Sequence, residues 1–260
     1  MLLTLVEKIK EAEGVISFVF KPEMPFSWKP GQFLHYTLPH RKPDERGFER
    51  FFTIASAPYE QVIYITTRLA KEKSSSFKKA LNSLKPGNTI EAVGPDGKFT
   101  VDDPREELVF IAGGIGVTPF RAILLDFEHK LLRSKLQSIP SGKFDHYFAH
   151  PRSRAARYSQ SLNKKISPKV TFLYSNKTKD FPYKKLLERL SKSNPNLKIH
   201  YFVDPKKIDE NSIRKIVKNL KKPIFYVSGP GGMVDSISDQ LMKLSAPKEH
   251  IKKDFFPGYD

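Results

Sequence analysis

A short segment of the first half combines an arginine, an aromatic ring and a hydroxyl. Residues 50–56 read RFFTIAS, and alternation in an extended strand places Arg50 and Phe52 on one side and Phe51 and Thr53 on the other. Arg50 offers a forked cation to a pyrophosphate, Phe52 a flat face to an isoalloxazine ring, and Thr53 a short hydrogen bond to a ring nitrogen. The set suits a flavin dinucleotide, but the motif alone is a weak signal, because an exposed arginine beside a core aromatic also arises by chance in many strands.

Two glycine-rich turns in the second half each follow an apolar run and precede a helical pattern. Residues 112–119 read AGGIGVTP, and residues 227–233 read VSGPGGM. Glycines let the backbone approach a phosphate closely, and a helix N-terminus adds unpaired N–H groups with partial positive charge. Thr118 is the expected helix cap, and Pro119 suits the first turn. The spacing departs from Gly-x-Gly-x-x-Gly and no acid follows about twenty residues later, so a turn without a ligand remains the alternative.

The arginine segment lies in a half with the pattern of an antiparallel barrel. Short apolar runs separated by Gly and Pro turns predict strands at Leu2–Ile9, Val15–Lys21, Gln32–Leu38, Phe51–Ala55, Gln61–Thr67 and Thr89–Val93. One helix starting near Ser75, with serines as candidate caps, interrupts them. The pattern predicts an antiparallel β-barrel domain over residues 1–103.

The glycine turns lie in a half where buried strands alternate with amphipathic helices. The predicted order is strand Leu108–Ala112, a helix from Thr118, strand Val170–Tyr174, helix Tyr183–Leu190, strand Lys198–Val203, helix Ser212–Leu220, strand Ile224–Ser228, helix Met233–Leu244 and strand Ile251–Phe256. Such alternation predicts a doubly wound parallel α/β sheet over residues 104–260. Ligands lie beyond the carboxyl ends of the strands in such sheets, so both glycine turns are expected at one ligand-binding edge.

Composition narrows the classes of function. The 260 residues include no cysteine, so the chain holds no disulfide, no thiolate nucleophile and no thiolate-bound iron–sulfur cluster of its own. His146 and His150 are four residues apart but have no third ligand nearby, so no metal site is predicted. No long apolar run and no secretory signal are visible, which favours a cytoplasmic protein without a transmembrane segment.

Positive charge is concentrated in one stretch of the α/β half. The formal net charge is +17, and residues 130–169 hold ten basic side chains against one acid, Asp145. A helix-to-strand connection normally takes a few residues, so a basic surface insertion is predicted at about 133–169. It is either a tolerated loop or an electrostatic docking surface for an acidic partner. Nucleic-acid binding is a weaker interpretation, because no nucleic-acid-binding motif accompanies the charge.

Taken together, the motifs resemble the ferredoxin–NADP reductase superfamily, whose members have an FAD-binding barrel followed by an NAD(P)-binding domain. The resemblance covers nearly the whole chain apart from the insertion. Five motifs follow the family order: Arg50/Phe52/Thr53/Ser56, Ser75-Ser76, the segment 94–99 (GPDGKF), the segment 113–119 (GGIGVTP), and Gly229-Pro230 with the aromatic tail.

The resemblance implies specific site residues. FAD contacts are implied for Arg50, Phe52, Thr53, Ser56, Thr67, Arg68, Ser75 and Ser76. Contacts to the pyridine nucleotide are implied for Gly113, Gly114, Gly116, Thr118, Ser175, Lys177, Gly229, Pro230 and Met233. Thr53, Ser228 and Phe255 are the implied catalytic residues. Ser228 stands where many members have cysteine, and Phe256 and Tyr259 remain alternatives to Phe255 as the aromatic residue that reaches the flavin.

The implied activity is hydride transfer between NAD(P)H and FAD, with electrons passing to a separate acceptor. The basic surface favours an acidic carrier such as ferredoxin or flavodoxin, and a small-molecule acceptor remains open. The alternative is a reductase or electron-transfer subunit of a multi-component system. Ser175, Lys177 and Lys179 at the tip of one strand favour a 2′-phosphate and hence NADPH over NADH, with the nearby Asp180 counting against it.

Overall fold

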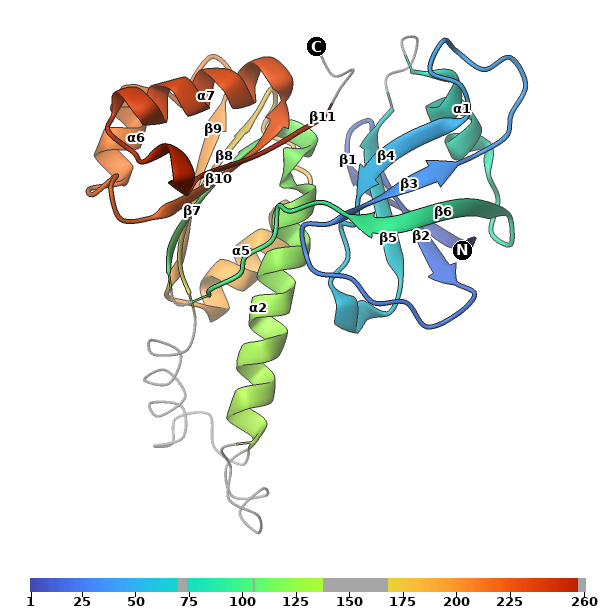
Figure 1. Ribbon diagram of the computed structural model, residues 1–260, viewed down its shortest axis with the longest axis horizontal. Coiled ribbons are helices and arrows are strands. Elements are labelled where there is room, and N and C mark those ends of the chain that lie inside the picture. Colours follow the sequence, from blue (N-terminus) through green and yellow to red (C-terminus); the bar gives the residue numbers. More distant parts are fainter. Residues whose placement is uncertain (70–73, 105, 138–167, 257–260) are drawn as a thin grey trace.

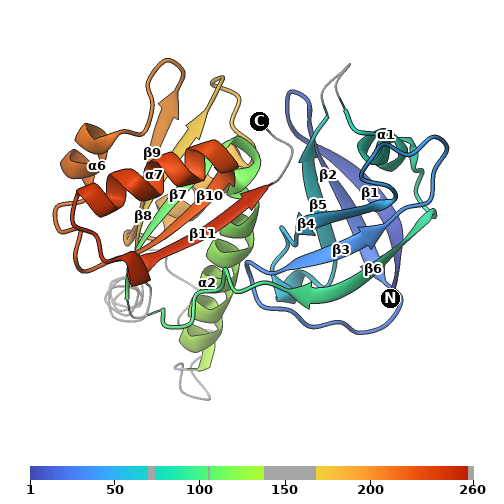
Figure 2. The same ribbon diagram turned by 45° about the horizontal axis from the view of Figure 1, so that its top comes forward.

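The computed structural model describes residues 1–69, 74–104, 106–137 and 168–256 of the chain. Two sheets lie side by side, and the long helix α2 (Thr118–Gln137) runs along the boundary between them (Figures 1 and 2). Residues 133–137 belong to this helix, so the helix extends beyond the predicted start of the insertion. The rest of the predicted insertion up to residue 167, including His146 and His150, lies outside the described residues.

The first sheet is a half-open antiparallel barrel of six strands. Its strands are β1 (Leu2–Ala12), β2 (Val15–Pro22), β3 (Phe33–Thr37), β4 (Glu49–Thr53), β5 (Ile63–Arg68) and β6 (Thr89–Asp96), in the order β4-β3-β6-β1-β2-β5. Inward side chains such as Phe18 and Leu34 fill its core. The two edges meet just after β4, where the Ala55 N–H donates to the Tyr64 carbonyl at 3.1 Å. All six predicted strands are present.

The single predicted helix of the barrel half is α1 (Ser76–Ser83). The Ser75 side chain accepts a hydrogen bond from the Lys78 N–H at 3.3 Å, which confirms the predicted serine cap. Phe77 and Leu81 are buried in the barrel core and fix the helix against it. The N-terminus of α1 therefore has a defined position beside the sheet.

The second sheet is parallel and doubly wound, as predicted. Its strands are β7 (Glu107–Gly113), β8 (Lys169–Asn176), β9 (Leu197–Val203), β10 (Ile224–Pro230) and β11 (Ile251–Phe256), in the order β11-β10-β7-β8-β9. Helices α2 and α5 (Lys184–Ser193) cover one face, and α6 (Glu210–Ile216) and α7 (Gly231–Lys243) cover the other. The chain reverses its direction of winding between β7 and β10, which places the topological switch point there.

One helix differs from its prediction. The sequence pattern predicts a helix over 212–220, whereas α6 spans Glu210–Ile216. Asp209 and Ser212 form a capping box that starts the helix earlier, and Val217 is extended and ends it.

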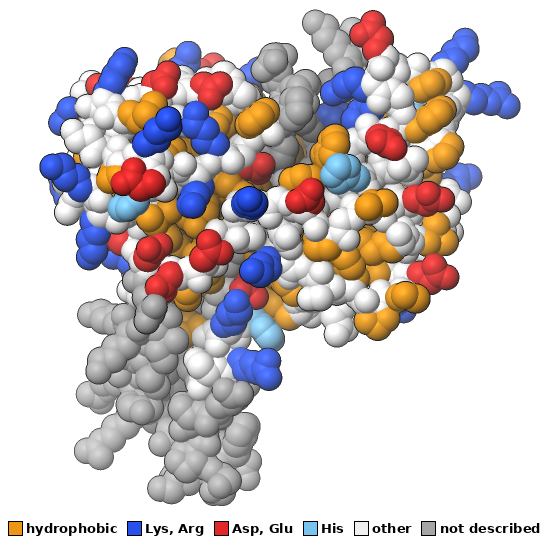
Figure 3. Space-filling model, viewed as in Figure 1, with side chains coloured by type: hydrophobic (Ala, Val, Ile, Leu, Met, Phe, Trp, Pro, Cys, Tyr) orange, Lys and Arg blue, Asp and Glu red, His pale blue; other side chains and the backbone are white. Residues whose placement is uncertain are grey.

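Charged side chains of both signs lie on the face of the molecule shown in Figure 3. On the face shown in Figure 3, basic and acidic side chains are interspersed rather than gathered by sign. Most of the positive stretch in the sequence lies outside the described residues. In the part of the chain that the structure covers, no helix is both long and apolar enough to span a membrane.

Candidate functional site

Arg50 on β4 is buried and surrounded by acceptors. The residue is 8% exposed, and its guanidinium donates to the carbonyls of Arg46, Gly47 and Glu49 at 3.0, 3.2 and 2.6 Å. It also donates to Asp44 Oδ1 at 2.5 Å. Among the described residues, the buried Nε of Arg50 has no hydrogen-bond partner. A further acceptor can therefore be accommodated at this guanidinium.

Asp44 links this arginine to the start of α1. Its Oδ2 accepts the Ser76 N–H at 3.0 Å, and its own N–H donates to Ser76 Oγ at 2.8 Å. Desolvation alone would raise the pKa of Asp44, but the hydrogen bonds from Arg50 and Ser76 outweigh it and lower the pKa to about 2. The carboxylate thus lies between a guanidinium and a helix N-terminus, two features that together bind anions.

Three arginines lie near enough to Lys78 of α1 to act on its charge. We call Arg46, Arg50, Arg68 and Lys78 the cation cluster. Burial, together with the positive charges of the three arginines, lowers the pKa of Lys78 to about 8. An open pocket of about 680 Å³ adjoins Asp44 and the start of α1. A polyanionic ligand would relieve the mutual repulsion within the cluster, so these residues fit a pyrophosphate.

Only part of this arrangement is visible in the sequence. The motifs select Arg50, Arg68, Ser75 and Ser76, and the structure brings Arg50 and Ser76 together through Asp44. Sequence reasoning missed Asp44, Arg46 and Lys78. The one available signal is an acid among arginines in the segment 41–46 (RKPDER), which lacks strand periodicity.

Phe52 and Thr53 continue β4 beyond Arg50. The Phe52 ring is 9% exposed and has its centre 5.8 Å from the centres of Tyr36 and Phe77. The residue therefore packs largely within the barrel core. Thr53 is 5% exposed at the end of the strand. The stacking and hydrogen-bonding roles implied for these two residues remain predictions.

Ser56 and Thr67 lie within the barrel. The Ser56 hydroxyl donates to the Val62 carbonyl at 2.6 Å and accepts the Tyr64 N–H at 3.2 Å. Both residues are fully buried. The Ser56 hydroxyl therefore closes the turn into β5, and the structure does not bring it to the cation cluster.

The two glycine turns lie at one edge of the parallel sheet, as predicted. Gly113 ends β7 and is followed by a 3-10 turn over Gly114–Val117, and Ser228 and Gly229 lie at the end of β10. We call these backbone segments the glycine edge. The strands β7 and β10 are paired neighbours, so the glycine edge coincides with the switch point of the sheet.

Glycine is required where the two turns touch. A Cβ at Gly116 would lie 2.2 Å from the Ser228 carbonyl oxygen and 2.5 Å from its carbon. A Cβ at Gly113 would lie 2.2 Å from Sδ of Met233. Backbone meets backbone at Gly116, which leaves no room for a side chain. Pro230 and Met233 begin α7 beside this contact.

The prediction that Thr118 caps α2 is wrong. Thr118 has helical dihedral angles, because the 3-10 turn precedes it and runs into the helix. Its hydroxyl donates back to the Ile115 carbonyl at 3.1 Å, and the residue is 2% exposed. The hydroxyl proton is therefore used within the turn.

Asp254, the acid at the start of the aromatic tail, lies beside Ser228. The two residues are partners in the β10–β11 register, and the fully buried Ser228 donates to Asp254 Oδ2 at 3.3 Å. Burial raises the pKa of Asp254 to about 7, with the Ser228 hydrogen bond acting in the opposite direction. Phe255 is the next residue and is 60% exposed. The glycine edge thus carries a carboxyl group that can exchange a proton near neutral pH.

The predicted nucleotide-selecting residues lie at the end of β8. Ser175 donates to the Ala112 carbonyl at 3.2 Å, and Lys177 is exposed. Asp180, whose negative charge would disfavour a 2′-phosphate, accepts a hydrogen bond from the Glu13 N–H of the barrel at 2.6 Å. The acid is therefore held against the other half of the chain.

Comparisons with known proteins agree with this architecture. No protein-family model matches the chain. Flavohemoprotein A of Dictyostelium discoideum is 25% identical over 267 residues, which cover 96% of this chain and 58% of that protein. The stachydrine N-demethylase reductase subunit Stc4 of Rhizobium meliloti is 34% identical over 124 residues, covering 46% of this chain and 34% of that protein. The chain therefore spans less than two thirds of the length of these relatives.

A solved structure matches over nearly the whole chain. Ferredoxin–NADP+ reductase from Plasmodium falciparum has a TM-score of 0.73 at 18% identity, covering 98% of this chain and 95% of that one. A half-open barrel followed by a doubly wound sheet with a glycine edge defines the class of two-domain reductase folds. The chain is thus similar in sequence to flavohemoproteins and shares the two-domain fold of ferredoxin–NADP+ reductase, in agreement with the predicted resemblance.

We expect Asp254→Asn to alter how stability depends on pH. The pKa of Asp254 rises from an ordinary 3.8 to about 7 on folding, so between these values the folded protein keeps a proton that the unfolded chain has lost. Rising pH therefore lowers the free energy of unfolding of the wild type between about pH 4 and 7, by a few kcal/mol. Asp254→Asn lacks this decline.

Denaturant unfolding of both proteins at several pH values from 4 to 8 measures the effect. The difference in unfolding free energy should grow across the interval and then become constant. The exposed Asp235 on α7 provides a matched control, since Asp235→Asn removes the same charge outside the buried strand. Parallel curves for Asp254→Asn and wild type would contradict the assignment.

Proposed function

We propose that the chain is an NAD(P)H-dependent flavin oxidoreductase that binds FAD on the barrel and passes its electrons to a separate acceptor. The observation that carries this proposal is the cation cluster at the start of α1. A carboxylate already lies between Arg50 and the α1 N-terminus, in the geometry that a phosphate oxygen requires. The sequence similarity to flavohemoproteins and the shared reductase fold support the same assignment.

The cation cluster would hold the FAD pyrophosphate, with Ser75 and Ser76 donating from the start of α1. Phe52 and Thr53 would contact the flavin ring from β4. A pyrophosphate bound in bidentate fashion would need Nη2 of Arg50 as well as the free Nε, so Asp44, which accepts from Nη2, must release it. The segment around Asp44 therefore exchanges its contacts when FAD binds.

The glycine edge would receive the pyridine nucleotide. Its glycine backbone would allow the nucleotide phosphates to approach closely at the switch point of the sheet. Ser175 and Lys177 lie at the end of the neighbouring strand β8. A lysine at this tip, with Asp180 engaged by the barrel, supports NADPH over NADH.

Bound FAD supplies hydride chemistry with reduced nicotinamide and releases electrons singly or in pairs. The residues of the chain orient the two rings and exclude water from between them. Ser228 and Asp254 would hold a proton beside the nicotinamide end of the site, since the pKa of Asp254 lies near 7.

The acceptor is proposed to be an acidic carrier of the ferredoxin or flavodoxin type, because the chain carries a net charge of +17. A small-molecule acceptor is compatible with the same site. The second candidate is a reductase subunit of a multi-component system, which the partial match to the Stc4 reductase subunit favours.

An absorbance spectrum followed by anaerobic titration tests the proposal. We expect flavin bands in the purified protein and their bleaching by NADPH at lower concentration than by NADH. A protein that is colourless after incubation with FAD overturns the assignment. Flavin that is bound but bleached by neither nucleotide supports the electron-transfer subunit instead.

A further inference from the structure

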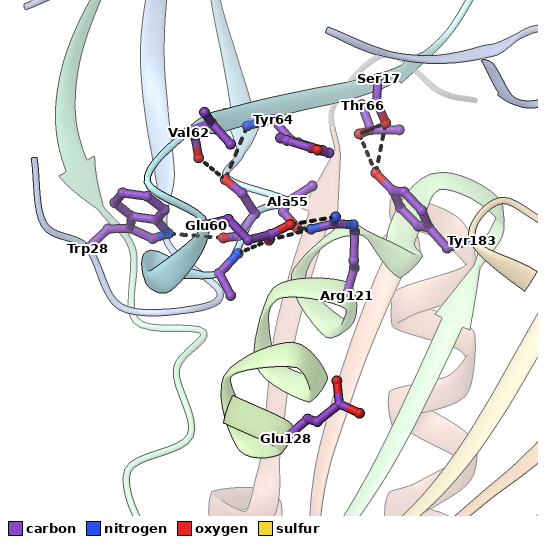
Figure 4. A network of polar contacts seen from close by, with 12 residues as sticks. Ser17, Trp28, Ala55, Glu60, Val62, Tyr64, Thr66, Arg121, Glu128 and Tyr183 are labelled. Atoms are coloured by element: carbon purple, nitrogen blue, oxygen red, sulfur yellow. Dashed lines mark hydrogen bonds and ion pairs between the residues drawn. The ribbon is translucent and has the colours of Figure 1, made fainter. Parts of the chain in front are cut away.

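One arginine of α2 joins the two halves through buried contacts. Arg121 is 7% exposed, and its guanidinium donates to the two carboxylate oxygens of Glu60 at 2.8 and 2.9 Å (Figure 4). It also donates to the Ala55 carbonyl at 2.9 Å. Glu60 and Ala55 belong to the barrel half, whereas Arg121 lies near the start of α2. The contact is therefore a bidentate ion pair between the two halves, which we call the clamp.

Aromatic rings enclose the clamp. The guanidinium carbon of Arg121 lies 4.5 Å from the ring centre of Tyr64 and 5.3 Å from that of Tyr183. The Tyr183 hydroxyl is hydrogen-bonded to Ser17, at 3.1 Å, and to Thr66, both on barrel strands (Figure 4). Solvent therefore screens the pair far less than it screens an exposed ion pair.

Tyr183 itself is held in an unusual backbone conformation. Its φ is 61°, in the left-handed region that a bulky side chain rarely adopts. Such a conformation persists when the surroundings determine it, and here the surroundings are barrel hydroxyls and Arg121. Residues of both halves therefore contribute to the contacts that hold Tyr183 at the boundary.

The clamp lies a few residues from both proposed ring-binding groups. Arg121 follows the 3-10 turn of the glycine edge by four residues, and Ala55 follows Thr53 by two. The Ile54 and Ala55 N–H groups donate to the carbonyls of Gln32 and Tyr64, at 2.9 and 3.1 Å. The Ala55 carbonyl is therefore fixed to the strands that flank Thr53.

We propose that Arg121 is a positioning residue whose contacts with Glu60 and Ala55 set the separation between the glycine edge and Thr53. The inference rests on the proposed function, in which those two groups hold the nicotinamide and the flavin ring. The clamp belongs to neither the cation cluster nor the glycine edge. Its loss should therefore slow hydride transfer more than it weakens binding of either nucleotide, because about 1 Å of misplacement costs on the order of a hundredfold in rate.

Two variants and a matched control separate positioning from general stability. Arg121→Met removes the clamp, and Arg121→Met/Glu60→Gln removes it without leaving an unpaired buried carboxylate. Arg189 also makes a bidentate pair, with Glu128 at 2.7 and 2.9 Å, but both residues lie in the α/β half and Arg189 is half exposed. Arg189→Met therefore removes a similar contact without touching the boundary.

Single-turnover reduction of the FAD-bound proteins by saturating NADPH gives the first readout. We expect the rate to fall about tenfold or more in both Arg121 variants, with the dissociation constants for FAD and NADPH within about threefold of wild type. Arg189→Met should match wild type in all three quantities.

The single tryptophan gives a readout that does not depend on turnover. Trp28 donates from its indole N–H to the Ser56 carbonyl at 3.1 Å, one residue from Ala55 (Figure 4). We expect the Trp28 emission of the full chain without FAD to shift in the Arg121 variants and to remain unchanged in Arg189→Met.

Two results overturn the inference. One is a wild-type transfer rate in the double variant, and the other is a loss of both affinities in proportion to the rate, which marks a merely structural contact. Failure of wild-type protein to bind FAD overturns the proposed function instead, and it is seen before any variant is compared.

Discussion

Replacing Arg50 with alanine is expected to weaken FAD binding by about two orders of magnitude or more. Hydrogen bonds from a charged donor contribute roughly 1.5–3 kcal/mol each, and the fork offers two to a pyrophosphate. Arg50 is also the member of the cation cluster that contacts the anion already present, Asp44. The affinity is measured by titrating the flavin-free full chain with FAD and monitoring the quenching of FAD fluorescence.

Asp44→Asn is expected to act in the opposite direction. The substitution keeps the size of the side chain but removes the charge that competes for Arg50, so FAD should bind about threefold to thirtyfold more tightly. The adjacent and exposed Glu45 is the matched control, since Glu45→Gln changes the net charge equally. If Asp44→Asn weakens FAD as Arg50→Ala does, Asp44 helps to hold the cofactor and its interpretation as a competing anion is wrong.

Gly116→Ala is expected to separate the two turns of the glycine edge. The added Cβ meets the carbonyl carbon and oxygen of Ser228 and the nitrogen of Gly229, all within 2.7 Å. These are backbone atoms of a buried strand end and cannot turn aside. We expect a loss of roughly 1–3 kcal/mol in the free energy of unfolding and a fall of about a hundredfold in the rate of hydride transfer.

Alanine substitutions at Gly113 and at Gly231, the first residue of α7, are expected to have smaller effects. At Gly113 the added Cβ meets the Met233 side chain, which can rotate, and at Gly231 it meets nothing within 4 Å. The losses should therefore follow the order Gly116→Ala, Gly113→Ala, Gly231→Ala, with the last near wild type. Thermal unfolding and stopped-flow reduction by NADPH measure both quantities, and equal effects at Gly116 and Gly231 would refute the role assigned to close backbone packing.

The sequence by itself determined the elements and their order. Alternation in segments such as Phe33–Thr37 and helical spacing in Ser76–Ser83 report burial on one face, so the strands and helices were predictable. Glycines between an apolar strand and a helix, such as Gly113 and Gly116, indicate a tight turn with close backbone approach. Arg50 and the glycine edge could also be predicted from the sequence, because the motifs that indicate them consist of adjacent residues.

The tertiary structure alone decided which distant groups meet. Arg121 and Glu60 are 61 residues apart, and nothing in the sequence around either residue indicates that the two form an ion pair. Asp44 at the start of α1, and the raised pKa of Asp254 beside Ser228, arise from burial and from partners on other elements. Thr118 was mispredicted because a preceding 3-10 turn moved the helix start. Periodicity reports which side of an element faces inward, whereas partners and electrostatic surroundings depend on how those elements are packed together.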